Sequence, residues 1–593
     1  MKRTLALETT KLTGEKVNLA GWVNARRDHG GVIFIDLRDE SGIVQLTVHP
    51  QEEVAFKFAE KIRDEYVLKV RGTVIERSSD LVNTDIATGK VEILVKDIKI
   101  LNKSDSPPFA INKDSQDVGE EIRLKYRYLD IRREKMQNML KMRAKFNSHI
   151  RRFMEEADFT EVATPILANS SPEGARDYLV PSRTHPGKFF ALPQAPQQFK
   201  QLLMVGGLPR YYQIAPCFRD EDPRADRHPG DFYQLDMEMS FVEDGEEVRI
   251  LLDRLFKSLT TDFAGKKLLF NDIPRITHHE SINKYGTDKP DLRFGMELVD
   301  LTESLSNTDF SVFKKPIEAG GVVKAICVDG GSKLSRKEID KFTEIAKTEG
   351  AGGLAYITII DGEIKSPIAK FLKKDELALI INKTSAKNGD AIFFGADSNK
   401  SLVNKVLGRL RNAFADHFKL KDPNIVAWAW IIDFPFYEWD DKNNKIDFGH
   451  NPFSMPKGGI DAFNVNTDEE RLHIIADQYD LVINGYEAAS GAVRNYNPDV
   501  MYKAFETVGI NRVDVDNKFG AMINAFKFGA PPHAGCAPGL DRIFMVLMDE
   551  PNIREVIAFP KNGSGIDVMM NSPSFIDQSQ LDELNISISD PKE

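Results

Sequence analysis

The sequence has few cysteines and no long hydrophobic run, and each shortage excludes a class of protein. Its three cysteines, Cys217, Cys327 and Cys536, lie far apart among 593 residues and offer neither a disulfide framework nor a zinc ligand set. The longest strongly apolar run, 425–432, is too short to span a bilayer and suits a buried strand. The first residues lack the apolar core of a secretory signal. We therefore expect a cytoplasmic protein with no membrane-spanning segment.

Positive charge is not in excess either. The chain has 79 Lys and Arg against 90 Asp and Glu, a formal net charge of −11. This balance argues against a generally basic nucleic-acid-binding surface but allows a local basic patch. The hydrophobic fraction of 41% and the charged fraction of 28% are those of an ordinary soluble protein. Because the length exceeds what one hydrophobic core can organise, three or more domains are expected.

Residues 1–103 are rich in β-strand patterns and predict a small barrel. Five strand-like segments are separated by Gly, Asp and Asn turns, and one helix-like segment, 52–65, falls between the third and the fourth. This order matches an OB-fold, whose face binds single-stranded nucleic acid through aromatic and basic side chains. Phe34 lies in the second strand and suits such a face, although a place in the barrel core is the simpler interpretation of one phenylalanine.

The rest of the chain predicts an α+β multidomain protein. Residues 104–140 begin with a polar, proline-containing stretch that indicates a linker or hinge. Residues 141–291 and 419–562 both contain strands and Gly-rich turns. Between them, 292–418 alternates strands with helices as a self-contained α+β insertion. The last segment, 563–593, is a C-terminal extension, and its polar tail after about residue 575 is expected to be loosely held.

The segment 217–241 gathers charges of both signs. It combines several arginines and carboxylates with the run FYQLDMEMSF, which alternates as a strand does. Asp236 and Glu238, two apart, therefore project from one face. A site of mixed charge suits an amino acid, and nearby arginines suit phosphates. Taken alone, the segment is also compatible with a solvated, salt-bridged hairpin.

A second segment, 531–549, begins as a Gly-rich strand end and continues as a helix. Gly539 and Arg542 stand in the first turn of that helix. Glycine allows close backbone approach, a helix N-terminus favours phosphate, and Arg542 would add a cation. By itself this pattern is no more specific than a tight strand–helix junction.

Taken together, these segments resemble motifs 1, 2 and 3 of the class II aminoacyl-tRNA synthetases, and more closely the bacterial-type aspartyl enzymes. The motif signatures are TPIL at 164–167, FRDE at 218–221 and GLDR at 539–542. The longer matching segments are 127–133, 171–183, 192–204, 211–227, 449–453, 479–494 and 531–561. The resemblance extends over essentially the whole chain.

The resemblance implies both an architecture and an activity. Residues 1–103 would be an OB-fold anticodon-binding domain, 141–291 and 419–562 one antiparallel-sheet catalytic domain, and 292–418 a GAD-like insertion. Such enzymes activate L-aspartate with ATP to aspartyl-adenylate and pass the aspartyl group to the 3′ end of tRNA(Asp). ATP is a substrate and Mg²⁺ a cofactor. Motif 1 implies a homodimer.

The chemistry explains the residue types. The α-carboxylate of aspartate is ionised at neutral pH, so no general base is needed and positioning and electrostatics dominate. By resemblance, the catalytic arginines are Arg219 and Arg542. The aspartate-binding residues are Glu173, Gln197, Lys200, Arg219, Asp236, His450 and Arg494. The ATP-binding residues are Arg219, Asp220, Glu221, His228, Phe232, Glu487, Gly539, Leu540, Asp541 and Arg542.

Within these sets the resemblance implies distinct roles. Arg219 bridges the substrate carboxylate and the α-phosphate. Glu173 and Asp236 attract the ammonium group. The side-chain carboxylate is read by Lys200, Arg494 and His450, and Phe232 stacks on adenine. Asp480 and Glu487 would hold Mg²⁺, although a separation of seven is also a plain same-face helical spacing.

The barrel carries the residues that would select the tRNA. By resemblance, the anticodon-reading residues are Arg27, Phe34, Gln45 and Glu92. His29 occupies a position that distinguishes strict enzymes from relaxed ones that also charge tRNA(Asn), and it favours the relaxed form. At a second such position, Leu81 fits the relaxed form and its neighbour Asp80 does not. The alternatives are a strict tRNA(Asp) enzyme, a sister synthetase for asparagine or lysine, and a catalytically dead tRNA-binding relative. The Lys200–Arg494 pair and the insertion disfavour the sister enzymes.

Overall fold

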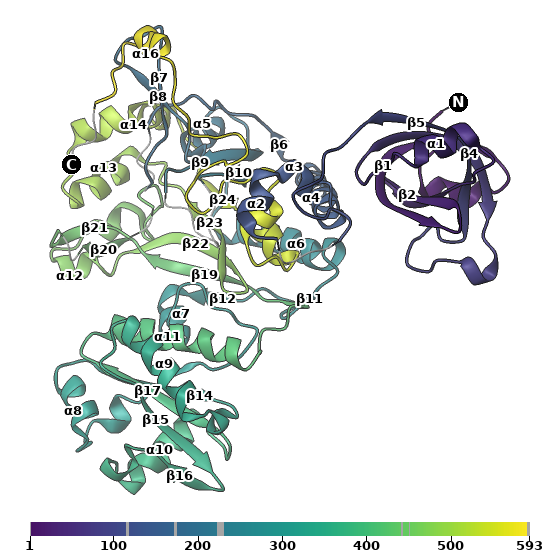
Figure 1. The fold of residues 1–593 in the computed structure, drawn as a ribbon. Helices are drawn as coiled ribbons and strands as arrows, with labels where there is room; N and C mark the ends of the chain where they lie inside the picture. Colours follow the sequence, from purple (N-terminus) through teal and green to yellow (C-terminus); the bar gives the residue numbers. More distant parts are fainter. Residues whose placement is uncertain are drawn as a thin grey trace. The chain divides into compact units, whose positions relative to one another are not determined.

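The computed structural model describes residues 2–113, 118–170, 175–221, 230–440, 443–449 and 451–589, and it forms two compact units (Figure 1). One unit comprises Met1–Lys141 with Ala558–Asn562 and Ile566–Pro573. The other comprises Met142–Ile557 with Gly563–Gly565 and Ser574–Glu593. We describe each unit by itself.

The first unit is built on a closed five-stranded barrel in the order β1-β2-β3-β5-β4. Alternate residues of each strand point inward, and Val23, Ile33, Ile35 and Leu46 are fully buried in the core. The single helix α1 lies between β3 and β4 in the sequence, which confirms the OB-fold prediction. The elements are β1 (Lys16–His29), β2 (Val32–Asp39), β3 (Gly42–Val48), α1 (Glu53–Ala59), β4 (Val67–Glu76) and β5 (Val91–Asn102).

A helical segment follows the barrel within the same unit. Arg127 and Arg133 both donate to the buried Asp130, at 2.6 and 3.1 Å, and Arg127 also donates to the carbonyl of Ala558. Because each of these charges is buried, mutual pairing is what makes their burial tolerable. The elements are α2 (Glu120–Lys125), α3 (Arg127–Asp130) and the start of α4 (Glu134–Glu156).

The second unit is organised by an eight-stranded sheet in the order β12-β19-β22-β23-β24-β10-β9-β6. Its neighbours are antiparallel except at the two ends, where β12 pairs with β19 and β6 with β9 in parallel. Trp428 and Trp430 of β19 are buried, so the apolar run 425–432 supplies buried strand as predicted, although it is divided between the two-residue β18 (Ile425–Val426) and the start of β19. The strands are β6 (Thr160–Glu161), β9 (Arg210–Phe218), β10 (Asp231–Ser240), β12 (Arg275–Thr277), β19 (Trp428–Pro435), β22 (Ile475–Ile483), β23 (Tyr486–Val493) and β24 (His533–Pro538).

Helices pack against this sheet. α5 (Gln197–Val205) and α15 (Leu540–Leu547) both contact β10, and α15 also contacts β23. The remaining helices of this part are α6 (Glu246–Ser258), α7 (His278–Tyr285), α12 (Asp468–Arg471), α13 (Pro498–Thr507), α14 (Arg512–Phe526) and α16 (Gln578–Leu584). Short strand pairs are β7 (Leu179–Pro181) with β8 (Phe189–Ala191), β11 (Lys267–Leu268) with β18 (Ile425–Val426), and β20 (Tyr437–Asp440) with β21 (Lys445–Phe448).

The chain between β12 and β19 forms a second sheet in the order β13-β14-β17-β15-β16. Helices cover both of its faces and create two cores, one containing Phe342 and Phe414 and the other Phe313 and Phe394. The strands are β13 (Leu298–Asp300), β14 (Val322–Val328), β15 (Ala355–Ile360), β16 (Glu363–Lys365) and β17 (Ala391–Asp397). The helices are α8 (Ser311–Glu318), α9 (Arg336–Thr348), α10 (Lys374–Thr384) and α11 (Lys400–His417).

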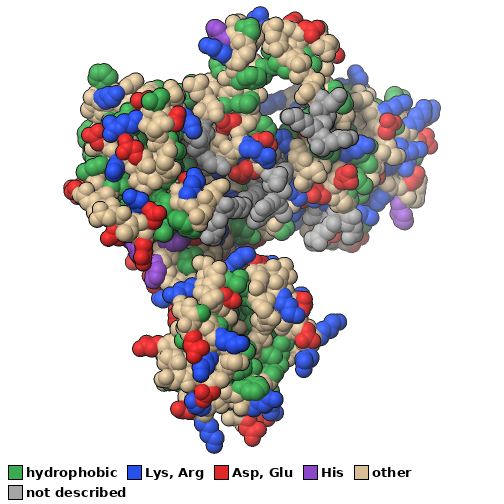
Figure 2. Space-filling view, turned by 90° about the vertical axis from the view of Figure 1, so that its left-hand side faces the viewer, with side chains coloured by type: hydrophobic (Ala, Val, Ile, Leu, Met, Phe, Trp, Pro, Cys, Tyr) green, Lys and Arg blue, Asp and Glu red, His purple; other side chains and the backbone are tan. Residues whose placement is uncertain are grey.

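Two surface properties bear on the sequence predictions. Among the described residues on the face drawn in Figure 2, Lys and Arg side chains are interspersed with Asp and Glu. Of the helices in the described part of the chain, none combines the length and the apolar character that crossing a membrane requires.

Candidate active site

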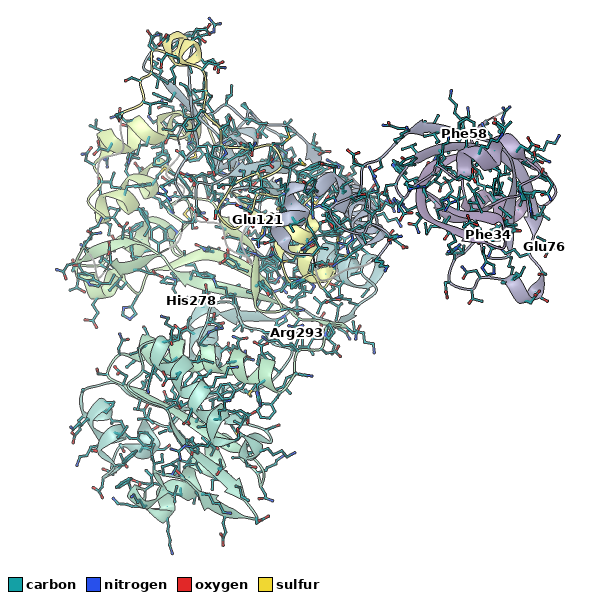
Figure 3. The ribbon with its side chains drawn as sticks, viewed as in Figure 1. Phe34, Phe58, Glu76, Glu121, His278 and Arg293 are labelled. Carbon is teal, nitrogen blue, oxygen red and sulfur yellow. The ribbon has the colours of Figure 1, made fainter. Side chains whose placement is uncertain are left out.

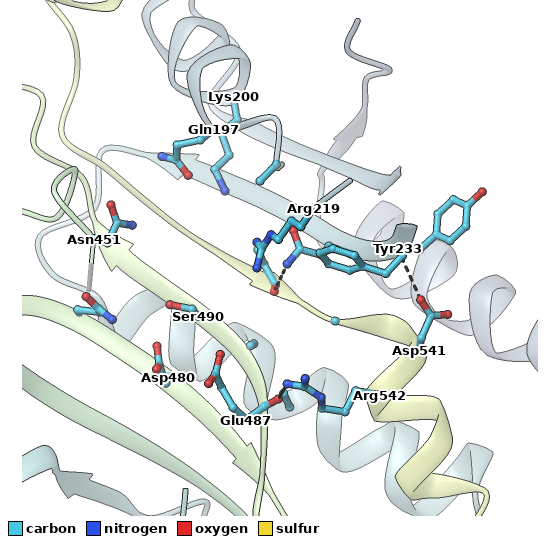
Figure 4. Close-up of a pocket in the computed structure, with 18 of the residues that line it drawn as sticks. Gln197, Lys200, Arg219, Tyr233, Asn451, Asp480, Glu487, Ser490, Asp541 and Arg542 are labelled. Atoms are coloured by element: carbon cyan, nitrogen blue, oxygen red, sulfur yellow. Dashed lines mark hydrogen bonds between the residues drawn. The ribbon is translucent and has the colours of Figure 1, made fainter. Parts of the chain in front are cut away.

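A cavity of about 430 Å³ opens above the central sheet of the second unit. Its walls come from α5, the segment after β9, β10, the β22–β23 hairpin and the junction of β24 with α15 (Figure 4). Segments that are far apart in sequence, including motifs 2 and 3, thus meet at one pocket. The lining residues that the sequence predicted are Gln197, Lys200, Arg219, Glu221, Phe232, Asp480, Glu487, Arg494, Gly539, Asp541 and Arg542.

One end of the pocket presents two buried cations. Lys200 is buried because α5 turns the face carrying Gln197, Lys200, Gln201 and Met204 toward the sheet, at helical spacing. Its Nζ lies 2.7 Å from Asp236 Oδ1 and 3.4 Å from Glu238 Oε2. Polar side chains on the buried face of a helix are rare unless a site requires them.

The second cation, Arg494, follows β23 and is held by Glu238. Its Nε donates to Oε1 at 2.9 Å and its Nη2 to Oε2 at 3.2 Å. A Cβ atom at Gly535 would stand 2.0 Å from Glu238 Oε2, so only glycine leaves room for this carboxylate. Two cations and two carboxylates therefore form one buried network.

The network shifts the pKa values of the two acids, Asp236 and Glu238, in opposite directions. Burial raises the pKa of Asp236, and the nearby Lys200 does not fully reverse this effect. Burial also acts to raise the pKa of Glu238, but the charges of Arg494 and Lys200 outweigh it and hold that pKa below its ordinary value. Glu238 is thus the fixed anion of the network, and Asp236 is the acid that takes a proton more readily.

Arg219 stands in the middle of the pocket, just after β9. Its guanidinium lies over the ring of Phe232 of β10, 5.1 Å from the centroid. Among the described residues, its buried Nε has no hydrogen-bond partner. A buried donor without a partner carries a free-energy penalty that a bound anion would relieve. Arg219 is therefore placed to bind a carboxylate or a phosphate.

The other end of the pocket carries acids on the β22–β23 hairpin. Asp480 of β22 pairs in register with Ser490, and Glu487 pairs with Val482. These two acids lie on neighbouring strands that a tight turn connects. The alternative that their separation of seven residues reflects one face of a helix is therefore wrong. Arg542 of α15 donates to the backbone carbonyl of Glu487, which fixes motif 3 against the hairpin (Figure 4).

The acids fit a divalent cation. Asp480 is buried, and among the described residues its Oδ1 accepts no hydrogen bond. Burial and the charge of Glu487 raise the pKa of Asp480 well above its ordinary value. A hard cation such as Mg²⁺ prefers carboxylate oxygens and would stabilise both ionised groups.

Some predicted residues occupy other places. Asp236 does not line the pocket but lies behind Lys200. Asp541 lines the pocket, but it accepts from the Tyr233 amide at 3.0 Å and pairs with Arg143 at 2.7 Å, so both of its oxygens are engaged with protein. Asp220 pairs with Arg176 through backbone atoms, and Leu540 is buried in α15. Glu173, His228 and His450 lie outside the described residues.

Sequence reasoning missed several residues of the site. Glu238, seen only as a neighbour of Asp236 on a strand face, holds Arg494 from behind the pocket. Gln478, Ser490 and Asn451 line the cavity itself. For Glu238, the only indication in the sequence is its place two residues after Asp236 on the same strand face. For Gln478, Ser490 and Asn451, no local pattern indicates a place in the pocket.

The predicted anticodon residues lie on the barrel of the first unit. Arg27 Nη2 donates to Asp36 at 2.8 Å and to Gln45 Oε1 at 3.3 Å, and Gln45 donates to Glu92 at 2.8 Å. Phe34 is the register partner of Arg27 and is only half-buried (Figure 3). Phe34 is therefore not part of the barrel core.

The two positions expected to select the tRNA are both exposed. His29 ends β1, and the two glycines after it both have positive φ, 61° at Gly30 and 77° at Gly31, which suits the tight turn into β2. The Leu81 side chain is 66% exposed.

Comparison with known proteins identifies the family. The family "tRNA synthetases class II (D, K and N)" matches residues 119–563, and the "OB-fold nucleic acid binding domain" matches 17–101. The chain is 49% identical to "Aspartate--tRNA(Asp/Asn) ligase" of Chlorobium chlorochromatii, covering 98% of this chain and 94% of that protein. It is 50% identical to the protein of the same name from Rickettsia conorii, covering 97% and 95%.

Solved structures agree on the fold. Aspartyl tRNA synthetase from Entamoeba histolytica has a TM-score of 0.57 at 19% identity, covering 95% of this chain and 92% of that one. Asparaginyl-tRNA synthetase from Pyrococcus horikoshii, solved with asparaginyl-adenylate, has a TM-score of 0.56 at 17% identity, covering 94% and 98%. These findings confirm the predicted fold class and the predicted ligase activity. With a matching family model over most of its length and relatives about half identical throughout, the chain belongs to the class II tRNA synthetases of the aspartate, lysine and asparagine group.

Proposed function

We propose that this chain is an aspartate–tRNA ligase. It activates L-aspartate with ATP to give aspartyl-adenylate and diphosphate, and then transfers the aspartyl group to the 3′ end of tRNA(Asp). The observation that carries the choice of amino acid is the buried pair of cations at one end of the pocket, Lys200 and Arg494. They lie across the pocket from the acids and Arg542, which suit the triphosphate of ATP.

In the first step, no protein group has to act as a nucleophile or a general base. An oxygen of the aspartate α-carboxylate attacks the α-phosphorus of ATP, a new O–P bond forms, and the bond to the diphosphate breaks. Arg219 would bridge the two anions that must approach and would stabilise the charge that develops on the α-phosphate. The ring of Phe232 lies against the Arg219 guanidinium and would hold that guanidinium in position. The same ring would stack on adenine.

The acids on the hairpin would hold Mg²⁺ through Asp480 and Glu487. When bound, Mg²⁺ supplies neutralising charge to the triphosphate. Arg542 is held by the carbonyl of Glu487, so it presents a fixed cation on the same side of the pocket. Gly539, at the start of α15, leaves the helix N-terminus accessible to phosphate.

Two cations favour aspartate over asparagine. The aspartate side-chain carboxylate would accept hydrogen bonds from Lys200 and Arg494. The side-chain amide of asparagine has one oxygen that can accept and an NH₂ group that can only donate. Its NH₂ group would face one of the two buried cations, which is unfavourable. Such mismatches in a buried site discriminate strongly.

The proposal is tested by ATP–pyrophosphate exchange with aspartate, asparagine and lysine in turn. Aspartate-dependent exchange is expected. Exchange that depends on asparagine or lysine would identify a sister synthetase instead. If no amino acid supports exchange, the chain is a tRNA-binding relative without activation chemistry.

The barrel is proposed to read the anticodon, and the first prediction concerns Phe34. Replacing Phe34 with alanine should weaken tRNA charging by about ten- to a hundredfold in kcat/KM, as expected for about 1–3 kcal/mol of base stacking. Exchange should stay intact, because Phe34 belongs to the barrel and not to the pocket. Phe58, an aromatic side chain on α1 that is 43% exposed (Figure 3), gives the matched control. Equal losses in the Phe34→Ala and Phe58→Ala proteins would contradict the assignment.

We also propose the relaxed tRNA specificity that the residue at position 29 favours. Aspartate and asparagine anticodons differ only in the third letter, and the exposed His29 offers a donor or an acceptor to either base. The relatives named above carry both tRNAs in their names. The exposed Leu81 fits the same form. A relaxed enzyme also requires an amidotransferase that converts the mischarged product.

The second prediction follows from this specificity. Wild-type protein should aspartylate purified tRNA(Asp) and tRNA(Asn) with comparable efficiency, and His29→Leu should lower charging of tRNA(Asn) by about tenfold while sparing tRNA(Asp). His29→Gln, which retains a donor and an acceptor, is the conservative control. A strong wild-type preference for tRNA(Asp) that His29→Leu leaves unchanged would exclude the relaxed form.

A homodimer and a cytoplasmic location complete the proposal. Motif 1 corresponds to the end of α4 and the two-residue strand β6, which lies at an edge of the central sheet. Large apolar side chains of the same unit are exposed, including Phe241 at 75% and Phe528 at 85%. The edge position of β6 supports pairing with a second copy, because an edge strand has unpaired backbone groups.

A further inference from the structure

The acids at the phosphate end of the pocket have a cationic neighbour from outside the three motifs. Lys289 Nζ lies 3.4 Å from Glu487 Oε2 and 3.1 Å from Asp288 Oδ2. Among the described residues, no other Lys or Arg forms an ion pair with either acid. Lys289 is 40% exposed and Glu487 42%, so the pair stands at the rim of the cavity that Glu487 lines.

This rim carries an excess of negative charge. Asp288, Asp480 and Glu487 are close enough to affect one another, since the charges of Glu487 and Asp288 both act to raise the pKa of Asp480. Lys289 is the ammonium that opposes them. As an ordinary lysine ammonium, it is charged at physiological pH.

The loop that carries Lys289 is fixed by the insertion. Arg411 of α11 is fully buried and donates to the carbonyl oxygens of Asp291 and Phe294, each at 2.8 Å. Its guanidinium also lies between the rings of Tyr285 and Phe294, 5.0 and 4.3 Å from the centroids. A buried guanidinium that donates to several carbonyls holds the backbone around it in one conformation.

The same loop packs closely on both of its neighbours. Gly286 has φ 71°, and a Cβ atom there would stand 2.2 Å from the Asn404 carbonyl oxygen of α11. On the other side, the Gly485 turn of the β22–β23 hairpin approaches Asp291, whose Cβ would be 3.2 Å from a Cβ at Gly485. The loop 286–293 thus connects α11 of the insertion to the hairpin that bears Asp480 and Glu487.

We infer that Lys289 is a positioning residue for the phosphate end of the pocket, carried by a loop that the insertion holds in place. Its ammonium holds Glu487 at the rim and lowers the negative charge that ATP meets there before a divalent cation arrives. The inference rests on the proposed function, because it assigns ATP to this end of the pocket. Through Arg411, which holds this loop, the insertion takes an indirect part in ATP binding.

The test uses Lys289→Met in the full-length protein. Without the ammonium, the acids should attract a divalent cation more strongly, so Mn²⁺ followed by electron paramagnetic resonance should bind the ATP-free protein about three- to tenfold more tightly. The KM for ATP in exchange should rise about tenfold when Mg²⁺ barely exceeds ATP. That increase should shrink to about twofold at saturating Mg²⁺, because the cation then replaces the missing charge. The KM for aspartate should not change.

Two further variants separate this role from a purely structural one. Lys289→Arg retains the charge and should behave as wild type in both measurements. Lys284→Met removes a charge of the same kind from α7, where Lys284 pairs with Glu280, and should change neither. An unchanged Mn²⁺ affinity in Lys289→Met, or a rise in the KM for ATP that does not depend on Mg²⁺, would overturn the inference. If wild-type protein lacked aspartate-dependent exchange, the proposed function would fail separately, and the Mn²⁺ measurement would still decide the role of Lys289.

Discussion

Replacing Arg219 with alanine is expected to reduce aspartate-dependent ATP–pyrophosphate exchange by about a hundred- to a thousandfold or more. The reason is that Arg219 is the central cation of the pocket, with a buried Nε that has no partner among the described residues. In the reaction two anions must approach each other, and charge then grows on the α-phosphate. A fixed guanidinium stabilises that arrangement more than it stabilises the separate substrates, so kcat should fall more than either KM rises.

The control for Arg219 is a charge removed elsewhere in the same unit. Arg336 on α9 is 85% exposed and pairs only loosely with Asp340 at 3.6 Å, so Arg336→Ala should retain full exchange. Arg219→Lys should recover only a small part of the activity, because an ammonium cannot form the bidentate bonds of a guanidinium. If Arg219→Ala retained more than about a tenth of the wild-type rate, the role assigned to this arginine would be wrong.

Replacing Lys200 with methionine is expected to raise the KM for aspartate by about a hundredfold or more, with little change in the KM for ATP. Lys200 is only 1% exposed and is one of the two cations proposed to bind the substrate side chain. Methionine is close to lysine in length and fills the same space, so the change is mainly electrostatic. Because binding of the side-chain carboxylate is lost in the ground state as well, the effect should appear in KM.

The same substitution should make stability depend on pH. Asp236, which Lys200 neutralises, already has a raised pKa because it is buried, and removal of the lysine raises it further. A carboxyl group whose pKa is higher in the folded state favours folding while it is protonated, and this contribution is lost as pH rises through the folded-state pKa. The thermal midpoint of Lys200→Met should therefore fall with rising pH more steeply than that of wild type.

A double substitution separates stability from binding. Adding Asp236→Asn to Lys200→Met removes the unpaired acid and should restore much of the stability at neutral pH, where breaking a buried pair otherwise destabilises by about 3–5 kcal/mol. The KM for aspartate should remain high in the double variant, because the cation is still missing. Recovery of both properties together would mean that Lys200 acts on the fold and does not bind the substrate.

The barrel and the strands of the site could be read from the sequence because their patterns are local. Alternation along β2 and β10, and turn residues such as Gly30 and Gly31, depend on neighbouring residues only. Alternation could not say whether the outer face of β2 is covered, because that depends on how the strands close into a barrel. The structure leaves Phe34 half-buried on the outside, where a core position was the simpler expectation.

The order of the elements and the family could be inferred from the sequence. So could the arginines of motifs 2 and 3 that line the pocket, Arg219 and Arg542. The tertiary structure alone decided which charges pair. Arg494 and Glu238 are separated by 256 residues and Lys289 and Glu487 by 198, so no local pattern relates them. It also decided that Asp480 and Glu487 face the pocket from two strands and not from one helix. The physical reason is that the energy of an ion pair depends on distance and burial in space, and folding sets both only when remote segments pack together.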